Sequence, residues 1–193
     1  MLHGPFSHYT TNFQLNIPKC LEKGSKYVLG FNEPDWPTPD GLNPYVDPAT
    51  AAQNFRDMIT PHSEQLSIGA PAVTSSVLEG KGVKWLRPFL EACKDCKIDF
   101  VPIHWYGEPG QGDAFLPHVD EVRELTRELL GEEVPLWITE FQLKGNDQQQ
   151  ADFLNLVLPE LEKRDFVARY SYFFVDQSLA GGPTADPGKA YVA

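Results

Sequence analysis

The sequence predicts an α/β fold built on a parallel sheet. Short, nearly continuous apolar runs, rich in β-branched residues, alternate with longer stretches whose apolar residues recur at helical spacing. Strands that are buried on both faces have continuous apolar sequences of this kind. Strands that alternate with helices along the chain are typical of a parallel sheet. The expected strands span residues 27–31, 67–73, 98–105, 136–141 and 170–175.

The stretches between these runs predict four helices. Asp47 followed by Pro48 indicates the start of a helix, because Asp47 can cap the helix and proline is favoured in the first turn. We expect Asp147 to cap the last helix, whose glutamines at 148–150 form a solvated first turn. The expected helices span residues 49–59, 83–92, 119–130 and 148–163.

Length and charge bound the class of protein. The 193 residues predict one domain, spanning residues 1–193. The net charge of −11 and the lack of a Lys/Arg run argue against nucleic acid or an anionic membrane surface as a partner. No stretch reaches the roughly 18 apolar residues of a membrane span. An acidic chain with 12% aromatic residues suits a neutral, polyhydroxylated substrate.

The three cysteines, Cys20, Cys93 and Cys96, do not predict a metal site. Zinc needs four ligands, and no second C-x-x-C or His pair follows the first. A thioredoxin-like redox pair opens a helix after a strand, whereas this pair ends a helix and precedes a strand. We therefore expect a local disulfide or two buried thiols, and no metal.

Ionisable and aromatic residues stand at the carboxyl ends of three otherwise apolar strands. Glu33 ends the first strand, His104 and Tyr106 end the third, and Glu140 ends the fourth. A single glutamate at a strand end is usually solvated or caps a helix. Two on separate strands form a natural acid/base or acid/nucleophile pair, which predicts a two-carboxylate glycosidase.

Side-chain alternation predicts which residues converge. If Glu140 points into the mouth of a barrel, Leu136 and Ile138 share its face and fill the interior, and Trp137 faces the helices. The same alternation directs His104 and Tyr106 toward both glutamates. Trp36, on the loop after Glu33, is either a sugar-stacking residue or a tryptophan packed on its own loop.

Five sequence motifs resemble glycoside hydrolase family 128, the glycosyl hydrolase catalytic core found in many fungi. The matching pieces are L-G-F-N-E-P-D at 29–35, I-G-A-P-A-V-T at 68–74, I-D-F-V-P-I-H-W-Y-G at 98–107, L-W-I-T-E-F at 136–141 and G-K-A-Y at 188–191. The likeness covers nearly the whole chain, with the motifs in the family's order.

The resemblance implies a retaining β-1,3-glucanase, expected to be endo-acting, that needs no cofactor. Carried over to this sequence, Glu33 would be the acid/base and Glu140 the nucleophile. Asn32 would bind the 2-hydroxyl of the sugar, and His104 and Tyr106 would contact the reacting sugar or position Glu140. The full-length form would work outside the cell or in the cell wall, although no signal peptide is visible.

The resemblance also implies a (β/α)8 TIM barrel that is incomplete in this chain. If Glu33 ends strand four, the segment at 2–4 is the tail of strand three, and strands one and two are absent; a full barrel has about 250 residues. A complete form would be a monomer. Whether these 193 residues hydrolyse glucan alone stays open, with a non-catalytic β-glucan-binding protein and an inactive fragment that does not fold by itself as the alternatives.

Overall fold

The computed structural model describes residues 1–39, 44–173 and 190–191, and its elements alternate as the sequence predicts. The parallel strands are β1 (Tyr27–Val28), β2 (Ser67–Ile68), β3 (Val101–Gly107), β4 (Leu136–Leu143) and β5 (Val167–Tyr172). The helices are α1 (Ser7–Glu22), α2 (Pro48–Met58), α3 (Val83–Ala92), α4 (Phe115–Leu130) and α5 (Asp147–Leu161), with 3-10 turns η1 (Thr60–His62) and η2 (Gly112–Ala114).

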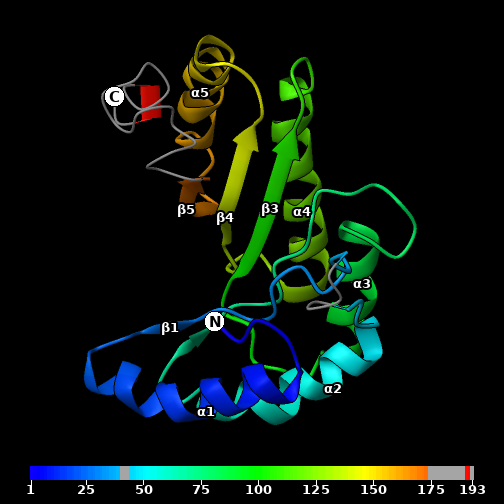
Figure 1. Ribbon diagram of the computed structural model, residues 1–193, viewed down its shortest axis with the longest axis vertical. Coiled ribbons are helices and arrows are strands. Elements are labelled where there is room, and N and C mark those ends of the chain that lie inside the picture. The colour runs from blue at the N-terminus through cyan, green and yellow to red at the C-terminus, as the bar shows by residue number, and fades with distance from the viewer. Residues whose placement is uncertain (40–43, 174–189, 192–193) are drawn as a thin grey trace.

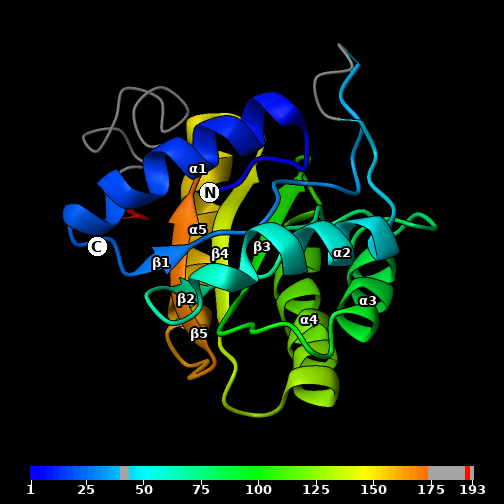
Figure 2. The same cartoon turned by 90° about the horizontal axis from the view of Figure 1, so that it is seen from below.

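The five strands follow one another in space in chain order. β1 pairs with β2, and β3, β4 and β5 form a second parallel sheet. Parallel bridges from Gly69 to Phe100 and from Val73 to Ile103 link the two sheets. Helices α4 and α5 flank β3 and β4, whereas α1 and α2 lie at the β1 end (Figures 1 and 2). The described strands thus form an arc with the strand order of a barrel, but they do not close into one.

The first residues of the chain run beside the strand that leads to Glu33. The amide of Leu2 donates to the carbonyl of Leu29 (3.2 Å), and the amide of Asn32 donates to the carbonyl of His3 (3.2 Å). This segment therefore takes the place of a neighbouring strand, as expected for the tail of strand three.

Strands β1 and β2 are shorter than predicted, because regular pairing ends soon after each begins. Each has two regular residues, and isolated bridges such as Asn32 to Ala72 continue the pairing beyond them. Strand β5 begins three residues earlier than the prediction of 170–175, whose last two residues lie outside the described part of the chain. Residues 188–189 of the expected family ending also lie outside it.

Helix α3 matches the predicted residues, the ends of α2 and α5 differ from the prediction by one or two residues, and α4 begins four residues earlier than predicted. Asp47 caps α2 as predicted, accepting from the amide of Thr50 (3.0 Å). The cap of α5 is Asn146 rather than Asp147, because Asn146 forms a reciprocal capping box with Gln149.

Helix α1 was not predicted, because its sequence signals are weak. Only Phe13 and Ile17 are buried along its 16 residues, no side chain caps its start, and Pro18 lies inside it. Proline inside a helix normally indicates a break. Packing of this narrow apolar face against the sheet end decides the structure here. None of the described helices has the length and apolar character needed to cross a bilayer.

The register of β3 against β4 shifts by one residue in front of the catalytic candidates. Ile103 lies opposite Ile138, but the next residue, His104, lies opposite Glu140. Thr139 is therefore an extra residue on β4. Such a β-bulge re-aims the side chains that follow it and recurs next to active sites.

The bulge corrects the predicted faces of β4. Trp137 lies in register with Pro102, and both line the cavity on the concave side of the sheet, where Trp137 was not expected. Leu136 and Ile138 are fully buried, and Ile138 also borders the cavity. Phe141 faces the helices, where it stacks against a phenylalanine of α4. Glu140 faces inward only because one residue is inserted.

Candidate active site

Glu33 sits at the end of the strand that begins with β1, in an unusual backbone conformation. Its φ angle of 43° makes it the sole non-glycine residue with positive φ in the described part of the chain. Its amide donates to the carbonyl of Ala72 (2.8 Å), and its carbonyl accepts from the amide of Trp36 (3.0 Å). Such strained residues cost about 1–3 kcal/mol each and cluster at functional sites.

His104 lies between the two glutamates. Its Nδ1 is 2.9 Å from Oε1 of Glu33 and 3.7 Å from Oε2 of Glu140. The imidazole is 2% exposed, whereas each glutamate side chain is 26% exposed and so reaches the solvent. The ring donates to an ionised Glu33 and accepts from a protonated one, so this hydrogen bond serves both states of an acid/base.

Tyr106 donates a hydrogen bond of 2.5 Å to Oε2 of Glu140. Burial raises the pKa of Tyr106, and the hydrogen bond and charge of Glu140 raise that pKa further. The phenol therefore stays protonated and remains a donor.

The two carboxylates are close enough to act on one bond. One oxygen of each glutamate and a ring nitrogen of His104 lie within 4.8 Å of one another. These three residues are also the group in the described part of the chain whose atoms could hold a metal ion. Each of the two carboxylates already has a hydrogen-bond partner in the protein, which is His104 for Glu33 and Tyr106 for Glu140.

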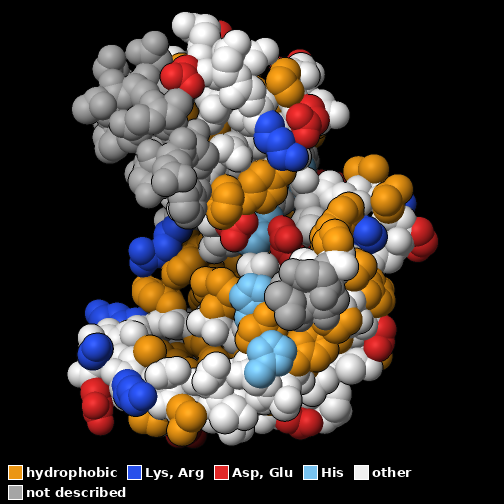
Figure 3. Space-filling view, in the orientation of Figure 1, with side chains coloured by type: hydrophobic (Ala, Val, Ile, Leu, Met, Phe, Trp, Pro, Cys, Tyr) orange, Lys and Arg blue, Asp and Glu red, His pale blue; other side chains and the backbone are white. Residues whose placement is uncertain are grey.

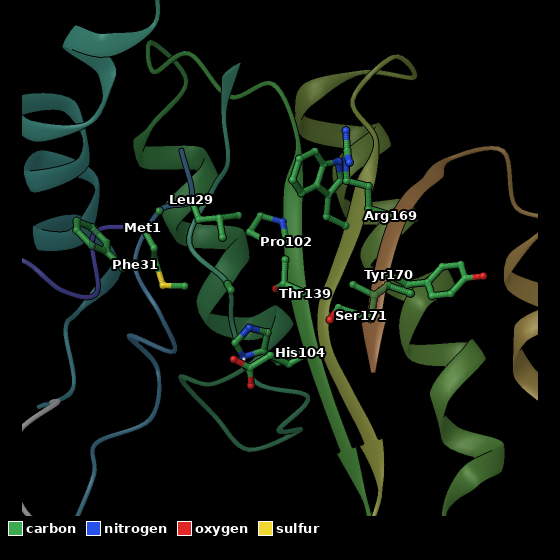
Figure 4. A pocket seen from close by; sticks show the side chains of 14 residues that line it. Met1, Leu29, Phe31, Pro102, His104, Thr139, Arg169, Tyr170 and Ser171 are labelled. Carbon is green, nitrogen blue, oxygen red and sulfur yellow. Dashed lines mark ion pairs between the residues drawn. The ribbon is translucent and has the colours of Figure 1, made fainter. Parts of the chain in front are cut away.

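His104 and Glu140 line a cavity of about 500 Å³ on the concave side of the sheet, whereas Glu33 is not among its lining residues. The molecule is hollowed on this face, with apolar side chains exposed along the hollow (Figure 3). Met1, Leu29, Pro102 and His104 point into the cavity, whereas Tyr170 points away from it (Figure 4). Apolar side chains thus share the walls with polar ones, and His104 and Arg169 lie at opposite ends of the cavity (Figure 4).

An aromatic layer forms the opposite end of this cavity, and sequence reasoning missed it. Trp137 stacks on Phe100 (3.9 Å between ring centroids) and meets Tyr27 edge-on (5.0 Å). The guanidinium of Arg169 lies 4.6 Å from the Trp137 ring and 5.0 Å from the Tyr27 ring. The register of β4 with β5 brings Arg169 to Trp137, and no sequence pattern marks that register.

Two predicted binding residues lie beside the pair and not within it. Asn32 precedes Glu33 and bridges to Ala72, so its backbone position is set by the sheet. Trp36 is 42% exposed, and the ammonium of Lys81 lies 3.6 Å above its ring. Trp36 therefore lies at the surface, and it does not line the cavity that Glu140 borders. Roles for both in sugar binding stay predictions.

The family match covers almost the entire chain. The glycosyl hydrolase catalytic core family matches residues 1–186. The chain is 33% identical over 175 residues to alkali-sensitive linkage protein 1 of Schizosaccharomyces pombe, a match that covers 87% of this chain. It spans only 30% of that relative's length.

Solved structures of glycoside hydrolase family 128 have the same fold. A curdlan-specific exo-β-1,3-glucanase of subgroup III from Blastomyces gilchristii superimposes with a TM-score of 0.82 and 34% identity, covering 94% of this chain and 75% of that one. A subgroup II endo-β-1,3-glucanase from Sorangium cellulosum superimposes with a TM-score of 0.72 and 26% identity, covering 98% and 76%. With its motifs, fold and paired carboxylates in agreement, the chain belongs to the glycosyl hydrolase catalytic core family.

Proposed function

We propose that this protein hydrolyses β-1,3-glucan with retention of configuration at the anomeric carbon. Glu33 protonates the glycosidic oxygen while Glu140 attacks the anomeric carbon and forms a glycosyl-enzyme. Glu33 then takes a proton from a water molecule whose oxygen attacks the anomeric carbon; the bond to Glu140 breaks, the sugar leaves and both side chains return to their starting states. We expect cleavage within the glucan chain, in a monomer that works outside the cell or in the cell wall.

The proximity of the two carboxylates carries this proposal. An inverting pair stands about 6.5–9.5 Å apart to admit a water, and a retaining pair about 5–5.5 Å apart. The nearest oxygens of Glu33 and Glu140 lie within 4.8 Å, which favours direct attack by one of them.

The neighbours of each carboxylate support the division of roles. Tyr106 donates to Glu140 from a phenol that stays protonated, which suits a nucleophile that must be ionised. Glu33 is bound to His104, whose ring can donate or accept, which suits a group that gives up and regains a proton. The β-1,3-glucanases of similar fold support the substrate.

Proton NMR of the first products tests the mechanism. Hydrolysis of a β-1,3-linked oligosaccharide should release the β-anomer first, with the α-anomer appearing only by later mutarotation. Initial release of the α-anomer would rule out the double displacement. Retention of the glucan on the protein without release of any sugar would instead identify a glucan-binding protein.

A further inference from the structure

Asp35 is a buried carboxylate whose role the acid/base and nucleophile leave unexplained. It is 0% exposed and lies two residues after Glu33. Its Oδ2 accepts from the hydroxyl of Thr74 (2.6 Å) and from the amide of Gly82 (2.8 Å), and the amide of Thr74 donates to both of its oxygens (3.2 and 3.3 Å). A buried carboxylate is costly unless it is hydrogen bonded, and this one is held by three donors.

These hydrogen bonds tie two loops together at the carboxyl ends of neighbouring strands. Asp35 lies on the loop after β1, Thr74 lies on the loop after β2, and Gly82 precedes the first residue of α3. Lys81, next to Gly82, covers the ring of Trp36, next to Asp35. Two adjacent residues of one loop are thus attached to two adjacent residues of the other.

Glu33 lies within this attachment. Its amide is held by the carbonyl of Ala72, and two residues later Asp35 is held by Thr74, so the strained segment is fixed on both sides. A residue in the left-handed region relaxes unless its surroundings hold it there. The Asp35 hydrogen bonds supply that constraint at the point where the chain leaves the sheet.

We propose that Asp35 is the positioning residue of the acid/base, holding the Glu33 backbone in its left-handed conformation so that the carboxylate stays against His104 and faces Glu140. The proposal rests on the proposed function, in which Glu33 is the proton donor. The rival interpretation is purely structural: Asp35 would stabilise the amino end of α3, as an anion near a helix amino terminus does.

Three variants separate these roles. Asp35→Ala removes all the hydrogen bonds, and Thr74→Val removes the shortest one while keeping the shape of the side chain. Asp99→Ala is the matched control, because Asp99 also binds β2 through its carboxylate, accepting from the amide of Ile68 (2.8 Å). That contact lies at the opposite end of the sheet from Glu33.

The kinetic comparison uses two substrates. One is β-1,3-glucan, whose leaving group needs a proton; the other is a dinitrophenyl β-glucoside, whose leaving group needs none. Because a misplacement of about 1 Å costs about 10²-fold, Asp35→Ala should slow hydrolysis of glucan by about 10²-fold. Its first step on the dinitrophenyl glucoside should stay near the wild-type rate. Thr74→Val should show the same bias more weakly, and Asp99→Ala should show none.

The crystal structures of the same variants provide a test that needs no turnover. Glu33 should leave the left-handed region, or its carboxylate should move away from Nδ1 of His104, in folded Asp35→Ala or, if that variant does not fold, in Thr74→Val. An unchanged Glu33 in those structures overturns the proposal, as does an equal loss on both substrates. A wild-type protein that hydrolyses neither substrate counts against the proposed function, and the crystal structures then still decide the role of Asp35.

Discussion

Glu33 and Glu140 carry the same functional group in different surroundings. Glu33 stands on a strained backbone and binds a buried imidazole, whereas Glu140 follows a bulge and accepts from a phenol. Both side chains are a quarter exposed, so access does not distinguish them. Their hydrogen-bond partners do, and these partners support the different roles that we propose for them.

Substitution of each glutamate by alanine tests the roles. Glu33→Ala should slow hydrolysis of glucan by about 10²–10⁴-fold, because proton transfer by a positioned side chain contributes that much. The same variant should form the glycosyl-enzyme rapidly from a dinitrophenyl glucoside, and azide should rescue its turnover by replacing the activated water. Glu140→Ala should form no covalent intermediate from either substrate.

Rapid kinetics and mass spectrometry of the trapped intermediate measure this difference. Glu108→Ala is the matched control, since Glu108 is an exposed glutamate after β3 that pairs with Lys144 (3.0 Å), and its loss should leave the rates unchanged. If the better leaving group restored Glu140→Ala instead of Glu33→Ala, the assigned roles would be exchanged.

The residues of the pair were predictable because their chemistry is out of place in their sequence context. A carboxylate, a histidine and a tyrosine at the ends of apolar strands indicate a site without any knowledge of the fold. Asp35 gave no such signal, since an aspartate in a loop rich in proline and glycine reads as solvated. Its complete burial depends on Thr74 and Gly82, which are about 40 residues away in the sequence.

Strand β4 shows where the alternation of side chains along a strand fails to predict the face on which each residue lies. Alternation placed Trp137 on the helix side, but the extra Thr139 moves Glu140 onto the same concave face as Trp137. A bulge has no reliable sequence signature here, because it is set by pairing with β3. Glu140 lines the cavity, as its predicted direction requires, whereas the helix-facing side assigned to Trp137 is wrong.

The disulfide between Cys93 and Cys96 joins the end of α3 to the segment before β3. Because the two cysteines are only three positions apart, the chain-entropy account gives it about 2 kcal/mol of stability at most. Reduction should therefore lower the midpoint of urea unfolding slightly. The hydrolysis rate should stay unchanged, since the cysteine pair precedes β3, whereas the catalytic candidates lie at the carboxyl ends of the strands.

Urea unfolding with and without dithiothreitol, together with a thiol count, checks this expectation. The count should rise from Cys20 alone to all three cysteines on reduction. A large loss of activity in the reduced but still folded protein would contradict the structural role of the disulfide.

For the whole molecule, binding of glucan to the folded form should appear as thermal stabilisation. A ligand at 100 times its Kd adds about 2.7 kcal/mol to the stability of the form that binds it. For a chain of 193 residues this corresponds to a rise in Tm of about 5–10 °C. The effect should appear in Glu140→Ala as well, because that variant binds glucan without consuming it.

Differential scanning calorimetry with a β-1,3-linked glucose pentamer measures the shift, and a β-1,4-linked pentamer of the same length is the control. A Tm that is unaffected by the β-1,3-linked sugar over a full titration would contradict binding at this site. A cooperative transition in the absence of sugar would also exclude the inactive-fragment alternative.

The sequence by itself determined the order of strands and helices, the identity of the catalytic candidates and their place at strand ends. These features are local, because apolar periodicity and capping residues act within a few positions along the chain. Only the tertiary structure decided the bulge at Thr139, the burial of Asp35, the helix at Ser7–Glu22 and the contact of Arg169 with Trp137. Each of these depends on pairing or packing between distant segments, whose register no single stretch of sequence specifies.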